Sequence, residues 1–358
     1  MKRFGYMLLC VLPLALLCTL CGCSSLSLGE RAIVKAIYLD GTPGSYTASL
    51  VVFTCEPTTD TASAKGEAKI YSATEEDIGE ALEAAEKEQA KVPFYAQNEL
   101  LFLGPQITQT GIGKALAYFT GEQAARPNLS VFTVPVDAQA FKKLEKTIAQ
   151  TIQEAERVAD DAQMGMGRTM SELDLQNEEE QFSGLLPVLR FGEQEEPKVD
   201  SMLLFQNDMP QGAMHGTQLG LALVAGGQTD RMQFSFYHDG GYYHVETQRL
   251  RLVKQAAQEE KGLRLHLSLA GSTAVITRDG KPLHGQEAQA AAGLVNDFLC
   301  QEWKKLNRKT FLKGNDICEL SFWLLQKDIP AAQAMIHAPV QERQGAVSFE
   351  SRLPLNAK

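Results

Sequence analysis

The alternation of apolar and polar positions after residue 30 predicts two β-strands. Residues 31–40, RAIVKAIYLD, alternate over most of their length, and a Gly/Pro turn follows. Residues 46–55, YTASLVVFTC, then alternate again. Successive side chains of a strand point to opposite faces, so a period of two marks strands with one buried face. We therefore expect a hairpin here.

Helical and strand patterns follow each other in the next hundred residues. Four apolar residues lie on one helix face, with Thr74 as the expected N-cap: Ile78, Ala81, Leu82 and Ala85. The next segments are expected as strand, helix and strand: residues 98–104, 111–121 and 128–135. This alternation predicts an α/β layer with a mixed sheet.

A long apolar stripe begins after Asp137. Its members recur at helical spacing over about six turns: Phe141, Leu144, Ile148, Ile152, Ala155 and Val158. Such a stripe is typical of a helix face buried in a core, and we expect core here and not a partner surface. The acidic run at residues 171–184 is expected as a solvated linker or loop edge and not as a metal site.

The second half of the chain predicts antiparallel strands around one helix. Residues 232–255 are expected as two strands joined at Asp239-Gly240-Gly241, a strong hairpin signal. Residues 263–276 add a strand, and residues 318–325 and 346–353 are expected to complete the sheet. The helix near residues 286–307 is expected to bury Ala291, Leu294, Val295, Phe298 and Trp303.

The N-terminus has the pattern of a secretory signal. Lys2 and Arg3 precede an apolar run, and no further charge occurs until Glu30. Leu20-Cys21-Gly22-Cys23 matches the bacterial lipobox, in which Cys23 becomes thioether-linked to diacylglycerol after cleavage. The alternative is a signal-anchor helix, since residues 4–22 are nearly long enough to span a bilayer. Pro13 and the lipobox favour the lipoprotein, and both interpretations leave the remaining chain outside the cytoplasmic membrane.

These patterns divide the chain into four expected parts and define its fold class. Residues 1–22 are a lipoprotein signal peptide, and residues 23–185 form an N-terminal α/β domain with a mixed sheet. Residues 186–227 form a small middle domain or connector, and residues 228–358 form a C-terminal α+β domain with an antiparallel sheet and a long helix. The expected class is thus α+β and mixed α/β, as a multi-domain lipoprotein ectodomain.

Charge and cysteine content narrow the function. The chain has 34 basic and 44 acidic residues, so we expect no nucleic-acid partner. Of seven cysteines, three leave with the signal and Cys23 is lipidated. The remaining Cys55, Cys300 and Cys318 allow at most one disulfide. Cys300 and Cys318 are the pair to consider, although buried free thiols are favoured.

No catalytic constellation is evident in the sequence. His244 and Glu246 would share a strand face, with His238 across the turn, which makes a weak metal site conceivable. Hairpin tips also collect polar residues without a function, so we expect no metal. The nucleophile elbow, the phosphate loop and the zinc-helix motif are all missing from the sequence. We therefore expect no enzyme activity, no catalytic residues and no cofactor.

The order of features resembles one known family. The lipobox is followed by ERAIVKAIYLD, which resembles the opening segment of the Ger(x)C family, the lipoprotein C subunits of spore germinant receptors. A helix then precedes the NELLFLG strand and the GIGKALAYFTG segment, in the family's order. GLLPVLRF and VDSMLLFQNDMPQGAMHG resemble its mid-chain region. The chain departs from the family's usual residues at Ser24-Ser25 and at Ala96-Gln97.

The resemblance implies a membrane-anchored subunit of a spore nutrient germinant receptor. It implies integral membrane receptor subunits as partners, a diacylglyceryl anchor, and a location on the extracytoplasmic face of the inner spore membrane. Only Cys23 carries over as a functional residue. The alternative is a solute-binding lipoprotein of an uptake system, which would need two similar βαβ lobes around a cleft. A secreted hydrolase is disfavoured because its motifs are missing.

Overall fold

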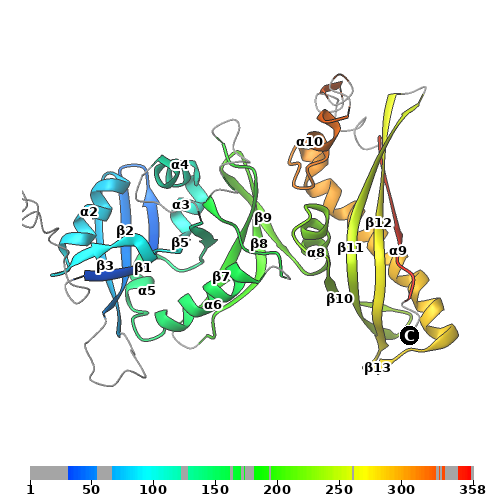
Figure 1. The fold of residues 1–358 in the computed structure, drawn as a ribbon, viewed down its shortest axis with the longest axis horizontal. Helices are drawn as coiled ribbons and strands as arrows, with labels where there is room; N and C mark the ends of the chain where they lie inside the picture. The colour runs from blue at the N-terminus through cyan, green and yellow to red at the C-terminus, as the bar shows by residue number, and fades with distance from the viewer. Residues whose placement is uncertain are drawn as a thin grey trace, which may run out of the picture.

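The computed structural model describes the chain from residue 31 to residue 355, with gaps. The described residues are 31–54, 67–121, 128–161, 164–170, 173, 181–192, 195–259, 262–327, 330, 333–334 and 346–355. They form two units placed side by side along the long axis of the molecule (Figure 1).

In the described residues, nine strands form the larger sheet, drawn in blue to green in Figure 1. Its spatial order is β3 (Glu67–Glu75), β2 (Ser45–Thr54), β1 (Arg31–Thr42), β5 (Leu100–Leu103), β6 (Ser130–Thr133), β7 (Gly184–Arg190), β8 (Lys198–Gln206) and β9 (Met209–His215). The short strand β4 (Val92–Phe94) pairs with the start of β1. Strands β1, β5, β6 and β7 are parallel, and hairpins flank them on both sides. The mixed sheet and the first hairpin were both predicted from the sequence.

Helices cover both faces of this sheet, and each face has its own core. On one face lie α2 (Ile78–Lys87), α3 (Pro105–Thr110) and α4 (Gly113–Gly121), with the short η2 (Tyr95–Gln97) close by. On the other lie α5 (Ala138–Lys142) and α6 (Ile148–Asp160). Parallel strands are typically covered on both faces in this way.

A buried carboxylate fixes α3 to the sheet. Asp40 Oδ1 accepts hydrogen bonds from Gln106 N (2.8 Å) and Ile107 N (3.1 Å), which are free amides in the first helical turn. Its other oxygen accepts a hydrogen bond from the Tyr38 hydroxyl at 3.1 Å. Burial of Tyr38, together with the charge of Asp40, raises the pKa of that hydroxyl. Gly104 is required here, because a Cβ would lie 2.4 Å from Asp40 Cγ.

The apolar stripe is buried as predicted, but it spans a broken helix. Phe141, Leu144 and Ile148 are each at most 3% exposed. However, α5 ends at Lys142 and α6 begins only at Ile148. The prediction of one continuous helix was therefore wrong. Apolar periodicity shows which residues face the core, but it does not show whether the helix is continuous. The turn between α5 and α6 keeps Leu144 in the same core as Phe141 and Ile148.

The expected N-cap at Thr74 was also wrong. Thr74 belongs to β3, and α2 is capped by Asp77, whose carboxylate accepts from Gly79 N at 2.8 Å. Strand β3 is polar because it lies at the sheet edge and pairs through hydroxyls. Ser72 Oγ donates to Ser49 Oγ at 2.6 Å. A polar edge strand gives no apolar alternation by which sequence could detect it.

The second unit contains the smaller sheet and the longest helix of the described residues. Its strands are β10 (Met232–His238), β11 (Gly241–Glu259), β12 (Gly262–Arg278), β13 (Lys281–Pro282) and β14 (Val347–Arg352). Its helices are α8 (Gly216–Ala225), α9 (Gly285–Lys309), η3 (Phe311–Lys313) and α10 (Leu320–Leu325). The hairpin at Asp239–Gly241 and the long helix agree with the sequence prediction. Strand β14 pairs parallel to β12, while the other pairs are antiparallel.

The expected strand at residues 318–325 was wrong, since this segment carries α10. The Asp316 carboxylate accepts from Leu320 N (2.8 Å) and Ser321 N (2.5 Å), which stabilises the start of a helix. A short apolar run does not distinguish a strand from a buried helix by periodicity alone.

Helix α8 joins the two units and was not predicted. It lies between β8 and β9 of the larger sheet and β10 and β11 of the smaller one (Figure 1). Its buried residues are Leu219, Leu221, Ala222, Leu223, Val224 and Ala225. They share one core with Met202 and Leu204 of β8 and with Phe234 and Val245 of the smaller sheet. A helix that is apolar on all sides is one buried on all sides.

The segment 186–227, expected as a small middle domain or connector, is thus divided between neighbours. Strands β7 to β9 continue the larger sheet, and α8 fills the junction. The predicted domain boundaries themselves stay a prediction.

Glu302 supports a prediction about acid stability. Its carboxylate accepts from Lys305 Nζ (2.6 Å) and from Gln218 Nε2 of α8 (2.9 Å). Burial acts to raise the pKa of Glu302, but these hydrogen bonds outweigh it, and the pKa lies below its ordinary 4.5. The ionised carboxylate therefore stabilises the fold above pH 4.5, and this contribution is lost as the pH falls through the lower folded pKa.

We therefore expect Glu302→Gln to lower the urea midpoint at pH 7 and to lose less stability on acidification than the parent chain. The matched control is Glu287→Gln at an exposed position of the same helix, which should follow the parent at both pH values. Equal acid sensitivity of Glu302→Gln and the parent chain would contradict the assignment.

Candidate functional site at the end of helix α8

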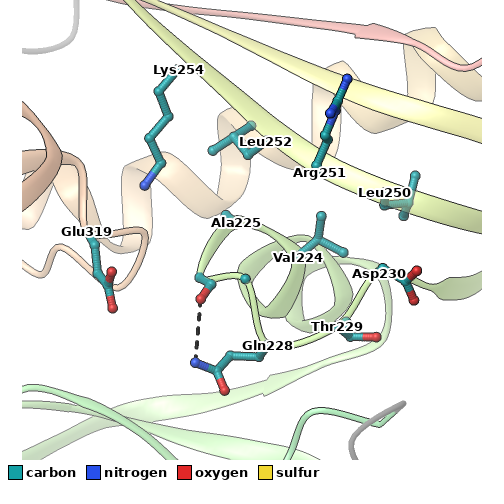
Figure 2. A pocket seen from close by; sticks show the side chains of 12 residues that line it. Val224, Ala225, Gln228, Thr229, Asp230, Leu250, Arg251, Leu252, Lys254 and Glu319 are labelled. Carbon is teal, nitrogen blue, oxygen red and sulfur yellow. Dashed lines mark hydrogen bonds between the residues drawn. The ribbon is translucent and has the colours of Figure 1, made fainter.

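An open groove lies at the C-terminal end of α8 (Figure 2). Its volume is about 610 Å³. The walls are the end of α8 with the loop that follows, the middle of β11, and the residue before α10. The lining residues are Val224, Ala225, Gly226, Gly227, Gln228, Thr229, Asp230, Leu250, Arg251, Leu252, Lys254 and Glu319.

Two local backbone features form the groove. Helix α8 stops at the glycine pair, where Gly226 N donates to Ala222 O and Gly227 has a φ of +71°. Glycine adopts this left-handed conformation without steric cost and commonly ends helices. On the facing strand the β11–β12 register shifts between Gln248 and Arg251, which is a bulge. Bulges redirect side chains, and this one lies beside the Arg251 side of the groove.

The groove carries charges of both signs. Lys254 Nζ donates to the Cys318 carbonyl at 2.7 Å, which links β11 to the loop before α10. Figure 2 shows Glu319 on the same side of the groove as this ammonium group, and Asp230 at the opposite end. Helix C-termini carry partial negative charge, so lysine and arginine near the end of α8 are favourably placed. Lys254 therefore has a structural role in the groove.

The lining residues offer charges and hydrogen-bonding groups but no histidine or cysteine. Within the described ranges, no group of three or more His, Cys, Asp and Glu side chains is arranged to hold a metal ion. The groove is therefore suited to binding through polar contacts.

Arg168 connects the floor of the groove to the first unit. It is 6% exposed, and its Nη1 donates to Gly165 O (3.0 Å), Gly167 O (2.6 Å) and Gln228 Oε1 (3.3 Å). Gln228 lines the groove, so this guanidinium group links residues 165–168 to the loop after α8. The backbone of Gly165 lies close to that of Gln228, since a Cβ on residue 165 would lie 2.4 Å from Gln228 O.

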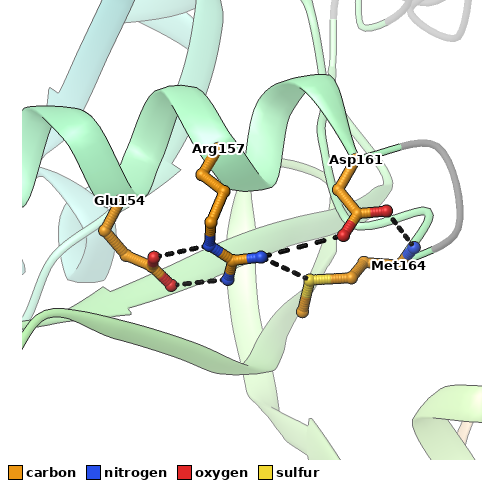
Figure 3. A network of polar contacts seen from close by, with 4 residues as sticks. All are labelled: Glu154, Arg157, Asp161 and Met164. Carbon is orange, nitrogen blue, oxygen red and sulfur yellow. Dashed lines mark hydrogen bonds and ion pairs between the residues drawn. The ribbon is translucent and has the colours of Figure 1, made fainter.

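A second polar network holds the turn that leads to Arg168 (Figure 3). Arg157 on α6 makes two hydrogen bonds to Glu154, at 2.7 and 2.8 Å, and an ion pair to Asp161 at 3.7 Å. Its Nη1 also contacts Met164 Sδ at 3.7 Å, and Asp161 Oδ1 accepts from Met164 N at 3.2 Å. The hydrogen bond to Glu154 raises the pKa of Arg157. The network fixes the end of α6 beside the junction.

The junction has a further pair of contacts at the other side of α8. Asn315, which is 2% exposed, donates from Nδ2 to Phe205 O at 2.6 Å. Gln206 Nε2 donates to Lys313 O at 3.0 Å. The larger sheet is thus bonded to the segment after α9 as well as packed against α8.

Cys23, the predicted lipidation site, lies outside the described residues. Among the described residues, none of the helices is both long enough and apolar enough to cross a bilayer.

The histidines expected near the hairpin do not converge. His244 Nε2 lies 3.8 Å from Glu246 Oε1, and Ser235 Oγ lies 3.1 Å from His244 Nδ1. His238 is paired with Asp239 instead, at 3.3 Å. His244 lies opposite Ser235 in the β10–β11 register, so the two side chains share one face of the sheet. His238 is three positions after Ser235 on β10, and its side chain therefore points to the other face.

Cys300 and Cys318 are free thiols. Cys318 is 3% exposed, and its burial raises the pKa of the thiol. Burial also raises the pKa of the half-buried Cys300. Both pKa shifts disfavour the reactive thiolate form.

Sequence reasoning missed the groove because it missed α8. The run LGLALVA has no polar side to give a helical period, so the pattern does not identify it as a helix. The glycine pair was the available signal, since glycine often follows a helix end.

Two matches relate this chain to known proteins. Residues 25–190 match the family model described as "Spore germination protein N-terminal domain". The fold is similar to that in "Crystal Structure of the GerBC protein", with a TM-score of 0.58 and 10% sequence identity. The similarity covers 90% of this chain and 97% of that chain. No match was found among curated protein sequences.

Residues 25–190 thus match a spore germination protein domain. This match, together with the fold shared over 90% of the chain, agrees with the Ger(x)C resemblance found in the sequence. The family resemblance and the fold class expected from sequence are thus confirmed.

Proposed function

We propose that this protein is the lipid-anchored C subunit of a spore nutrient germinant receptor. It would act with integral membrane subunits, on the extracytoplasmic face of the inner spore membrane, to trigger germination. The single observation that carries the proposal is the match of residues 25–190 to the spore germination domain. The shared fold over 90% of the chain supports it.

The proposed anchor would hold the protein close to its partners. Arg31, the first described residue, lies eight positions after Cys23, and a fully extended chain spans about 3.5 Å per residue. The start of β1 would therefore stay within about 28 Å of the lipid. Encounters with membrane subunits become effectively intramolecular at such range, so that weak contacts are sufficient.

We further propose that the role is one of binding and not of catalysis. The groove beside α8 presents charged side chains and backbone groups without an imidazole or a thiol. The Arg168 contacts and the shared core join the two units. Because the two units are joined, the binding of a partner to one unit would also affect the position of the other unit.

Deletion of the gene tests the proposal. Spores without the protein should lose their response to particular nutrients, while sporulation yield and heat resistance stay normal. Restoring the full chain should restore the response. Germination of the deletion spores at the parent rate on every nutrient that triggers the parent would contradict the proposed function.

Calorimetry with the same nutrients tests the accessory role. The purified chain by itself should show no binding at micromolar nutrient concentration, because the membrane subunits would hold the nutrient site. Micromolar binding to this chain would make it the sensor and would favour the solute-binding alternative.

A further inference from the structure

The smaller sheet is covered on one face and open on the other. Phe234 and Phe236 of β10 stack on Phe298 of α9, with ring centroids 5.7 and 4.6 Å away. Alternate residues of a strand face opposite sides, so the intervening positions face outward. At the β10–β11 end these positions form a surface that we call the outer patch: Gln233, Ser235, Tyr237, Tyr242, His244, Glu246, Val275 and Thr277.

The outer patch concentrates exposed apolar side chains. Tyr237 is 71% exposed, Tyr242 is 54% exposed and Val275 is 36% exposed. They are three of the six large hydrophobic residues classed as exposed in the described part of the chain. Tyr237 and Tyr242 lie directly opposite each other on neighbouring strands. Tyrosine is enriched at protein interfaces, where its ring packs and its hydroxyl finds a polar partner.

The other half of the same sheet face is different. At the β12–β14 end the outward side chains are polar and bond to one another. Ser268 Oγ donates to Glu350 Oε1 at 2.8 Å, and Arg352 Nη2 donates to Glu350 Oε2 at 2.8 Å. Ser348 Oγ lies 2.7 Å from His266 Nδ1. That half needs no partner, whereas the tyrosine end leaves aromatic surface in water.

The charge around the outer patch is negative. Glu246 is the one acidic residue of the patch, and the patch has no lysine or arginine. Two exposed turn carboxylates lie beside it, on Asp239 and Asp279. Asp239 lies 3.3 Å from His238 Nε2 and Asp279 lies 3.9 Å from Arg278 Nε, so the three carboxylates outnumber the one arginine. Arg278 lies over the ring of Tyr243, which occupies the covered face. A carboxylate beside aromatic faces is complementary to a cation.

We propose that the outer patch docks a protein segment that presents an arginine or lysine side chain. The cation would lie over the faces of Tyr237 and Tyr242, on the side of the Asp279 carboxylate, which accepts from Tyr242 N at 2.9 Å. Glu246, four positions along β11, would add to the attraction, and aliphatic atoms of the segment would cover Val275. The proposal rests on the proposed function, since an extracytoplasmic segment of a membrane receptor subunit would supply this partner. A bilayer is the less suitable occupant, because an anionic lipid surface repels Glu246, Asp239 and Asp279.

Co-isolation of the receptor from spores tests this proposal. The full-length, tagged chain would be extracted in mild detergent, and the co-isolated membrane subunits would be quantified. Tyr237→Ala with Tyr242→Ala should reduce their amount at least about ten-fold, as expected for loss of interface tyrosines. Glu246→Lys should also reduce it, through repulsion of the partner's cation.

The matched control is Ser268→Ala with Ser348→Ala, on the polar half of the same face. This double variant should retain the membrane subunits at the parent level. Each purified variant should remain folded, and the tyrosine variant should lose at most the stability that one cross-strand aromatic pair contributes. Loss of the membrane subunits from a tyrosine variant that remains folded then supports docking.

Three results would overturn the proposal. If the parent chain retains the membrane subunits and the tyrosine variant retains them equally, the outer patch is not the docking surface. If the parent chain retains none, the proposed function fails and the inference fails with it. If a dye at Tyr242→Cys enters an apolar environment in phosphatidylcholine–phosphatidylglycerol vesicles without receptor subunits, the patch rests on lipid.

Discussion

Replacing Cys23 with alanine should abolish lipid attachment and release the protein from the membrane. In a lipoprotein the two acyl chains on this cysteine provide the stable anchor, which a single chain would not. The described residues, 31 to 355 with gaps, contain no helix able to span a bilayer in their place. Labelled palmitate should therefore be incorporated by the parent chain and not by Cys23→Ala. After a high-salt wash, the variant should be found in the soluble fraction.

Cys21→Ala provides the matched control for this experiment. Cys21 lies two residues before Cys23 and would leave with the signal peptide, so its replacement should preserve both labelling and membrane retention. A Cys23→Ala chain that stays membrane-bound at its uncleaved size would contradict the expected release. It would instead indicate that residues 4–22 act as a helical anchor.

Phe141→Ala should cause the largest loss of stability among the single changes considered. Phe141 is fully buried, and its ring stacks on Tyr38 with centroids 4.2 Å apart. It also lies 6.3 Å from the rings of both Phe102 and Phe191. Truncating a buried phenylalanine removes these contacts and leaves a cavity, at a cost of about 3–5 kcal/mol. Urea unfolding should show a clearly lower midpoint.

Lys142→Ala is the control, at the next and exposed position of the same helix. It should change the midpoint little, because exposed substitutions of this kind cost less than about 0.5 kcal/mol. If Phe141→Ala unfolds at the parent midpoint, the aromatic cluster does not stabilise the larger unit. Ile148→Ala at the start of α6 should also lower the free energy of unfolding, by about 2–5 kcal/mol if the cavity that it leaves does not collapse.

The larger sheet was largely predictable because its inner strands are buried and apolar. Strands β1, β2, β5 and β6 carry continuous or alternating apolar runs, which mark them without tertiary information. Strand β3 was missed because its edge position allows serine and threonine. The break between α5 and α6 was missed because the buried face continues across it.

The second unit shows the same limits. The hairpin between β10 and β11 was marked by its Asp-Gly-Gly turn, and α9 by its apolar period. Helix α10 was taken for a strand, because a short apolar run fits both structures until Asp316 is seen to cap it. The last turns of helix α8 have no polar side, because both sheets pack against them.

The sequence by itself determined the features that depend on local pattern or on recognisable order along the chain. These are the mixed sheet, the long C-terminal helix, the buried stripe at Phe141 and the Ger(x)C family. The tertiary structure alone decided where α8 lies, how Arg168 meets Gln228, and that Tyr237 and Tyr242 share an open sheet face. The reason is physical: a local pattern records whether a side chain is buried, whereas its partners come from segments far away in the sequence. Arg168 and Gln228 are 60 residues apart, and only the packing of the two units brings them together.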